Sequence, residues 1–152
     1  MLLQFSVTNH RSIKNTAVIS MKAAADKSMK ECLITPDGKK KIVPVMAIYG
    51  ANAAGKSNVI HALLLMREMV CGNYAKPLKG EELPYEPFAF VDEQIEPTAL
   101  EVIYYYEGIK YAYGFSFNNE RIISEYLYHW PNGREALIFN LSLIHISEPT
   151  RH

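Results

Sequence analysis

Apolar and polar residues follow different patterns in the two halves of the chain. In the first half, Leu2–Val7 and Ala17–Met21 are short apolar runs that predict two strands joined by a polar turn at Thr8–Ser12. Ile42–Tyr49 is apolar and β-branched with little alternation, which predicts a strand buried on both faces of a parallel sheet. Ser57–Val70 is apolar on most of its surface and predicts a helix packed between layers.

In the second half the apolar positions alternate with a period of two, which is typical of strands. Strands are predicted at residues 100–106, 109–117, 121–130 and 136–139. The turn signals between them are Glu107-Gly108, Asn118-Asn119 and Pro131-Asn132-Gly133. These segments together predict an antiparallel β-meander. The connection before it, Gly72–Thr98, is rich in Pro, Glu and Tyr and is predicted to be irregular.

One segment has a pattern associated with phosphate binding. Gly50-Ala51-Asn52-Ala53-Ala54-Gly55-Lys56-Ser57, called the glycine loop below, fits the Walker A pattern G-x-x-x-x-G-K-[ST]. Glycines let successive N–H groups face one anion, and a helix starting at the loop adds the positive end of its dipole. We expect Lys56 to contact the β- and γ-phosphates and the Ser57 hydroxyl to ligate Mg²⁺. ATP is the expected nucleotide, because the Asn-Lys-x-Asp pattern that reads guanine is absent from the sequence.

Composition limits which partners and which cellular location the sequence supports. The 16 acidic and 16 basic residues cancel, so net charge gives no argument for binding nucleic acid or an anionic membrane, and only a local basic patch on a missing segment would leave such binding open. Residues 23–41 are Lys-rich, and Lys39-Lys40-Lys41 is interpreted as a solvated loop rather than a phosphate site. No signal peptide or apolar run of about 20 residues occurs, which predicts a cytoplasmic protein without a membrane partner. Cys32 and Cys71 are interpreted as lone thiols.

Two segments resemble a known family. FSVTNHRSIKN at Phe5–Asn15 and IYGANAAGKSN at Ile48–Asn58 resemble the start of an ABC/SMC-type ATPase head. Within that group the chain is most similar to bacterial AAA-type ATPases related to the OLD (overcoming lysogenization defect) proteins. Ala53, where SMC and RecF proteins usually have glycine, and Asn58 both favour that assignment. The resemblance covers roughly residues 1–140 and implies an α/β P-loop NTPase fold, the ABC-ATPase-like N-terminal lobe with its meander.

The resemblance also implies site residues. The expected nucleotide-binding set is Gly50, Ala51, Asn52, Ala53, Ala54, Gly55, Lys56, Ser57, Asn58, Arg11 and Ser12, with Ser57 as the metal ligand. Arg11 and Ser12 belong to the turn after the first strand, which lies near the nucleotide in such heads. The alternative is that Arg11 is a surface cation. Asn52 would orient the γ-phosphate or the attacking water, or have a structural role in the turn.

The partners follow from the same resemblance. A complete protein is expected to form a head-to-head homodimer around ATP and to control an effector, such as a nuclease or a toxin, in phage defence. A DNA-repair ATPase of the RecF or SMC type is one alternative. The other is a nucleotide-binding fragment without catalysis.

The motifs that complete such a head are not found in the sequence. A signature motif, a Walker B Asp with its catalytic Glu, and a switch His are all expected after the meander. Phe88–Glu93 has Walker B character, but it precedes the meander and is interpreted as a decoy. Leu141–Arg151, LSLIHISEPTR, reads as an in-frame translation of a sequencing adapter. We therefore expect residues 1–140 to be an incomplete ATPase lobe, residues 141–152 to be non-native, and ATP hydrolysis to be negligible.

Overall fold

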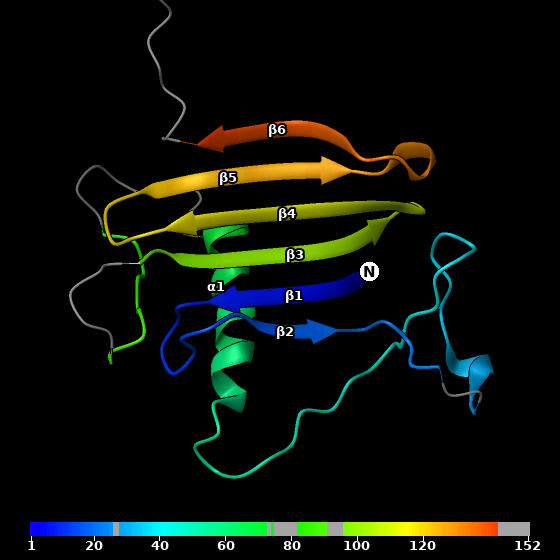
Figure 1. Ribbon diagram of the computed structural model, residues 1–152, viewed down its shortest axis with the longest axis horizontal. Coiled ribbons are helices and arrows are strands. Elements are labelled where there is room, and N and C mark those ends of the chain that lie inside the picture. Colours follow the sequence, from blue (N-terminus) through cyan, green and yellow to red (C-terminus); the bar gives the residue numbers. More distant parts are fainter. Residues whose placement is uncertain (26–27, 73, 75–81, 91–95, 143–152) are drawn as a thin grey trace, which may run out of the picture.

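A computed structural model describes residues 1–25, 28–72, 74, 82–90 and 96–142. Within these ranges the chain forms a six-stranded antiparallel sheet with a helix on one face (Figure 1). The strands are β1 (Leu2–Thr8), β2 (Ala17–Ser20), β3 (Thr98–Tyr106), β4 (Ile109–Phe117), β5 (Ile122–His129) and β6 (Ala136–Ser142). Their order across the sheet is β2-β1-β3-β4-β5-β6. The helix is α1 (Lys56–Cys71), and short 3₁₀ turns occur at η1 (Lys30–Cys32) and η3 (Pro131–Gly133).

The predicted meander is confirmed. Strands β3 to β6 pair in sequence order, and Leu100 lies opposite Phe115 while Val102 lies opposite Tyr113. The β3–β4 turn is formed by Glu107 and Gly108, both with positive φ, as a two-residue hairpin of the strand-compatible hand requires. β3 starts at Thr98, within the connection predicted to be irregular, and β6 runs two residues beyond the boundary predicted at residue 140. That boundary stays a prediction, and residues 143–152 lie outside the described part.

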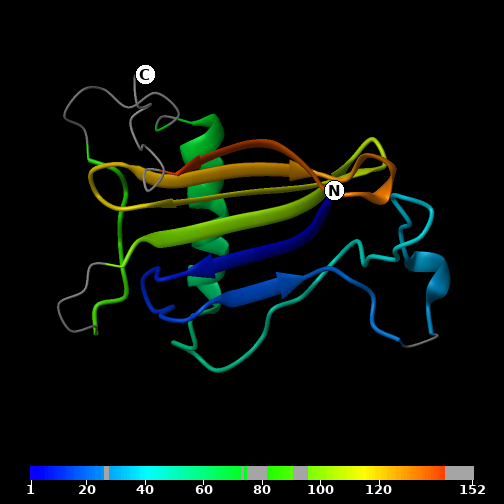
Figure 2. The same cartoon turned by 45° about the horizontal axis from the view of Figure 1, so that its top comes forward.

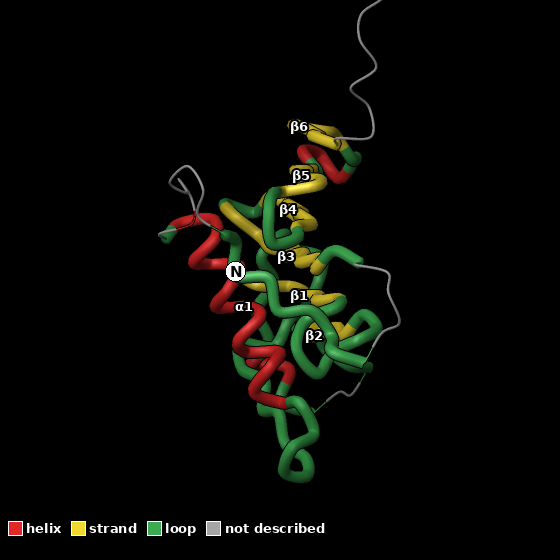
Figure 3. Tube along the Cα trace, turned by 90° about the vertical axis from the view of Figure 1, so that its left-hand side faces the viewer, coloured by secondary structure: helices red, strands yellow, loops and turns green. Residues whose placement is uncertain are grey.

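The core lies between α1 and the sheet. On α1, Ala62, Met66 and Met69 form a buried stripe, because residues three and four apart share one face of a helix. The stripe belongs to one hydrophobic cluster with the strand residues Phe5, Val7, Leu100, Phe115 and Phe117. Figure 3 shows α1 along one side of the sheet. Burial of each large apolar side chain stabilises the fold by about 1.5–3 kcal/mol.

The helix prediction is confirmed in position, and only one of the two packing layers expected for it lies within the described residues. α1 begins one residue before and ends one residue after the predicted range. The face away from the sheet exposes Ile60 and Leu64, so the described residues cover one face of the helix. No helix in the described ranges is long and apolar enough to cross a membrane.

The strand predicted at Ile42–Tyr49 is not formed. Ile42 is fully buried and bridges Lys22 and Ile34, but the segment after it forms no strand. Val45 is 77% exposed and Tyr49 is 92% exposed. A strand forms only when neighbouring strands satisfy its backbone groups, and every strand of the described sheet is antiparallel and pairs elsewhere. The parallel sheet expected before the glycine loop is therefore absent from the described residues.

Candidate nucleotide-binding site

The glycine loop leads into the first turn of α1, and three of its residues, Gly50, Ala53 and Gly55, have positive φ. Gly55 caps the helix at φ 82°, and Ala53 has φ 62°. The left-handed region suits glycine at no steric cost, whereas an alanine there costs roughly 1–2 kcal/mol. Ala53 thus occupies a position where glycine would be less strained. Residues 50–54 are exposed, so the mouth of the loop is accessible from solvent.

Lys56 folds back across this loop. Its ammonium donates hydrogen bonds to the carbonyl oxygens of Gly50 at 2.8 Å and Ala51 at 2.6 Å. These contacts hold the positive charge over the loop, beside the first backbone N–H groups of α1, which have no partner within the helix. Charge and helix dipole therefore favour an anion at the same place.

The turn after β1 contacts the base of the glycine loop. Asn58 donates a side-chain hydrogen bond to the Ser12 hydroxyl at 2.6 Å. A Cβ at Gly55 would lie 3.0 Å from the same hydroxyl oxygen, so the approach of Ser12 leaves little room for a side chain there. The structure thus brings together Ser12 and Asn58, two of the predicted site residues that are 46 positions apart. Nucleotide contact by either residue stays a prediction.

Arg11 is engaged by a carboxylate. Its guanidinium forms an ion pair with Glu86, and its backbone N–H donates to the Glu86 carbonyl oxygen at 2.8 Å. The side-chain hydrogen bond from Arg11 holds the pKa of the Glu86 carboxyl below its usual value. Both side chains are partly exposed, so the pair contributes little to stability. Arg11 is therefore ion-paired in this structure, and its role as a nucleotide neighbour or as a surface cation stays a prediction.

The turn itself is anchored by Asn9, which sequence reasoning did not single out. The Asn9 side chain donates to the Glu96 carbonyl oxygen at 2.5 Å and accepts from the Phe88 N–H at 2.9 Å. The Thr98 hydroxyl donates to the Asn9 carbonyl oxygen at 2.6 Å. The partners are about 80 to 90 positions away, so no local spacing could have shown this role.

A hollow of about 240 Å³ lies beside this turn, against α1. Its lining is His10, Arg11, His61, Leu64, Leu65, Glu68, Tyr74, Pro84 and Glu86. His10 is 2% exposed, and neither of its ring nitrogens has a hydrogen-bond partner among the described residues. Burial, followed by the charge of Arg11, lowers the His10 pKa, which favours the neutral imidazole.

The donor chemistry around Ser57 fits Mg²⁺ bound together with phosphate. Ser57 is exposed in the first turn of α1 and follows Lys56 directly. Magnesium usually takes one or two protein oxygens and completes its octahedron with phosphate oxygens and water. The described part of the chain holds no cluster of His, Cys, Asp or Glu that could bind a metal by itself.

Part of the Walker B decoy falls outside the described structure. Phe88 and Phe90 contact each other edge-on at 5.7 Å between ring centroids. Residues 91–95, which include the decoy's acidic pair Asp92-Glu93, lie outside the described ranges. The cysteines fit the expectation for lone thiols, because Cys32 and Cys71 are both free and exposed.

A G-x-x-x-x-G-K-S loop at the start of an apolar helix defines the class of P-loop nucleotide-binding proteins. The family is shown by residues 45–151, which match the model described as "AAA domain, putative AbiEii toxin, Type IV TA system". The chain therefore belongs to this family of AAA-type, nucleotide-binding ATPases associated with abortive infection, which generally use ATP and Mg²⁺. A search of the curated proteins finds no match to the chain.

Proposed function

We propose that the chain binds Mg·ATP at the glycine loop, with Lys56 on the phosphates and Ser57 on the metal. The observation that supports this most directly is the Lys56 ammonium, held over the loop mouth by two carbonyl oxygens. The loop carbonyls do not neutralise the ammonium, so a phosphate entering the loop meets a full positive charge. Membership of an AAA-type family supports the choice of nucleotide.

Ser12, Asn58 and Arg11 form the second part of the proposal. Ser12 and Asn58 are hydrogen-bonded to each other at the base of the loop, and we assign them to positioning it. Arg11 would contact the nucleotide only after sharing or releasing Glu86, since that carboxylate now holds its guanidinium.

The first prediction tests the loop. Lys56→Ala should weaken ATP binding at least about tenfold, because an ionic contact with phosphate contributes roughly 1.5–3 kcal/mol. Isothermal titration calorimetry with ATP and Mg²⁺ measures this, and GTP in the same titration tests the preference for adenine. Lys14→Ala is the matched control, because Lys14 is an exposed lysine outside the loop.

Equal ATP affinity in wild type, Lys56→Ala and Lys14→Ala would refute the proposed site. ATP hydrolysis is measured in the same samples. We expect no turnover above that of Lys56→Ala, because no carboxylate in the described residues contacts Lys56 or Ser57. Binding with such background turnover would support nucleotide binding without catalysis by this chain.

The finer assignment rests on the resemblance. We propose an OLD-related, ABC/SMC-like ATPase lobe that acts in phage defence, and the abortive-infection association of the family supports this choice. The loop sequence with Ala53 and Asn58 favours it over a RecF or SMC repair ATPase. Head-to-head pairing around ATP, and a nuclease or toxin effector, are further hypotheses from the same source.

A further inference from the structure

The segment between β2 and the glycine loop forms a scaffold at one end of the sheet (Figure 2). Ala23 N–H donates to the Lys41 carbonyl oxygen at 3.0 Å, and Val43 N–H donates to the Met21 carbonyl oxygen at 2.8 Å. Ile34 and Ile42 exchange two backbone hydrogen bonds at 2.9 Å, and Ile42 is fully buried beneath them. Residues 21–25, 33–34 and 39–43 are thus held side by side.

A tight turn fixes the third of these segments. The Asp37 carboxylate accepts hydrogen bonds from the backbone N–H groups of Lys39 at 2.9 Å and Lys40 at 2.7 Å. Its other oxygen accepts from the hydroxyl of Tyr105, a buried residue of β3, at 2.9 Å. The lysine run is therefore presented by a turn anchored to the sheet, and Asp37 is used by that anchor.

The scaffold encloses a hollow of about 480 Å³, called the lysine hollow below. Its lining is Lys22, Ala23, Ala24, Ala25, Lys30, Leu33, Lys39, Lys40 and Lys41. The five lysines come from three separate segments, and the described residues of the lining include no carboxylate. None of the five is ion-paired with a carboxylate that the structure describes. Several like charges gathered around one hollow attract anions to it.

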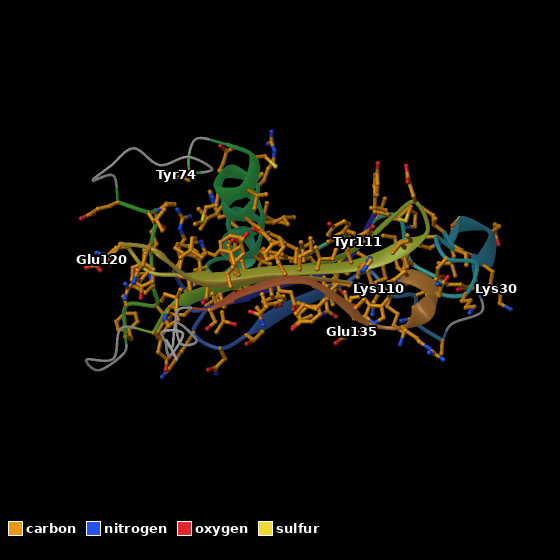
Figure 4. The ribbon with its side chains drawn as sticks, turned by 90° about the horizontal axis from the view of Figure 1, so that it is seen from above. Lys30, Tyr74, Lys110, Tyr111, Glu120 and Glu135 are labelled. Carbon is orange, nitrogen blue, oxygen red and sulfur yellow. The ribbon has the colours of Figure 1, made fainter. Side chains whose placement is uncertain are left out.

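Positive charge continues from the hollow onto the sheet. Figure 4 places Lys30 and Lys110 toward the same end of the sheet. The Lys110 ammonium lies 3.3 Å from the centroid of the Trp130 ring. The pKa of Lys110 is lowered, mainly by burial and to a smaller extent by the charge of Lys40, while Glu135 raises it. The ammonium groups of Lys110 and Lys40 therefore affect each other. The cationic surface thus extends beyond the hollow to an aromatic ring.

We propose that the lysine hollow is a binding site for a chain of phosphate groups, separate from the glycine loop. A run of phosphates matches several ammonium groups at once, whereas one carboxylate would neutralise only one or two of the five. Lysine ammonium groups bind phosphates as point charges, so the site needs no preformed ring of N–H donors. The two sources of such a chain are the backbone of single-stranded nucleic acid and a free oligophosphate.

This inference goes beyond the interpretation from the sequence, and it leaves Lys39, Lys40 and Lys41 exposed to solvent. Lys39-Lys40-Lys41 alone looks like a solvated loop, and the neutral net charge gave no support for a polyanion. The fold adds Lys22 and Lys30 to the run and places the only carboxylate of the turn, Asp37, in hydrogen bonds to the backbone and to Tyr105. The basic patch is a product of the fold and not of the composition.

The second prediction tests the lysine hollow in a Lys56→Ala background, so that the glycine loop does not compete for phosphate. A fluorescein-labelled oligothymidylate is titrated by fluorescence anisotropy, and inorganic tripolyphosphate by calorimetry. Replacing Lys39, Lys40 and Lys41 together by alanine should weaken binding about tenfold or more, and raising the salt concentration should weaken it further. The turn is expected to persist, because its hydrogen bonds to Asp37 come from the backbone.

The matched control is the triple variant Lys14→Ala, Arg67→Ala, Arg121→Ala, which removes three exposed cations outside the hollow. If the Lys39–Lys41 variant does not fold, Lys22→Ala with Lys30→Ala removes two charges from the other segments. If the hollow variant alone loses oligothymidylate binding, the phosphate chain that the hollow binds is the backbone of a nucleic acid. Selective loss of tripolyphosphate binding alone supports a free oligophosphate. No binding of either probe, or equal loss in the control, overturns the proposal whatever ATP does at the glycine loop.

Discussion

His10 shows how one buried residue couples the turn after β1 to pH. Its ring is buried without a hydrogen-bond partner in the described part of the chain, beside Arg11, Glu86 and His61. Its pKa is lowered in the fold, so the unfolded chain takes up the proton first as pH falls. The stability that comes from burying neutral His10 is complete above the unfolded pKa of about 6.5 and is lost as pH falls below it.

The third prediction follows from this linkage. The free energy of unfolding of the wild type should fall between about pH 7.5 and pH 5.5, and His10→Phe should flatten that dependence. Phenylalanine keeps a ring in the site and removes the group that titrates. Chemical denaturation at both pH values measures the effect. His61→Gln is the control, because His61 is exposed and its loss should leave most of the dependence in place. An identical pH dependence in His10→Phe and wild type would contradict the assignment.

At the same scale, the sequence predicted the identities of the loop residues but not their partners. Lys56 and Ser57 follow from a local motif, whose spacing is itself the signal. Arg11 was predicted as either a nucleotide neighbour or a surface cation, and the structure shows an ion pair with Glu86, 75 positions away. No local pattern encodes a pairing at that distance.

Among the elements, β4 and β5 show a close cross-strand fit. Gly114 lies opposite Tyr126, whose hydroxyl donates to the Glu101 carboxylate on β3. A Cβ at Gly114 would lie 2.4 Å from the Tyr126 hydroxyl oxygen and 2.5 Å from its ring carbon Cζ. Because Gly114 has no side chain, the Tyr126 ring can lie over β4 and reach Glu101 on β3.

The fourth prediction is that Gly114→Ala destabilises the sheet by about 1–3 kcal/mol, because the methyl group displaces Tyr126 and breaks its bond to Glu101. In a Tyr126→Ala background the same change should cost much less, since the ring is gone. Urea denaturation of the four proteins gives the coupling between the two positions. Additive effects of the two substitutions would show that Gly114→Ala lowers stability by a route other than displacement of Tyr126.

The elements were predicted well where their signal is local. Alternation along β3, β4 and β5, with Glu107-Gly108 and Asn118-Asn119 between them, is sufficient to specify a meander. Ile42–Tyr49 has equally strong strand composition, yet it forms no strand because no described segment offers it a parallel neighbour. Composition shows that a segment suits a strand, whereas pairing depends on the rest of the fold.

For the molecule as a whole, the described residues form one charged surface and one apolar surface. The lysine hollow lies at one end of the sheet, while the apolar surface follows the outward side of α1 and the segment before the glycine loop. Neither surface could be predicted from sequence, because each joins residues from separate segments or depends on which helix face the sheet covers. The apolar pattern of α1 is the same whether one face or two are packed.

The fifth prediction concerns that uncovered helix face. Ile60 is 46% exposed and Leu64 is 49% exposed, and with Val45 and Tyr49 they give more apolar surface than scattered single residues would. The chain should therefore bind a hydrophobic dye such as anilinonaphthalene sulfonate. Ile60→Lys with Leu64→Lys should lower that signal while changing stability by only about 0.5 kcal/mol per site, because both positions face solvent and lysine is a good helix former.

Met66→Lys provides the contrast for the fifth prediction. Met66 lies six residues after Ile60 on the same helix but faces the sheet and is 4% exposed. A lysine there would bury a charge without a partner and should unfold the domain, which raises dye binding and removes the circular dichroism of the sheet. If the outward double variant also unfolds the chain, Ile60 and Leu64 are packed in solution and the one-layer arrangement is wrong. If it folds and still binds the dye as strongly as the wild type, the exposed surface lies elsewhere than on α1.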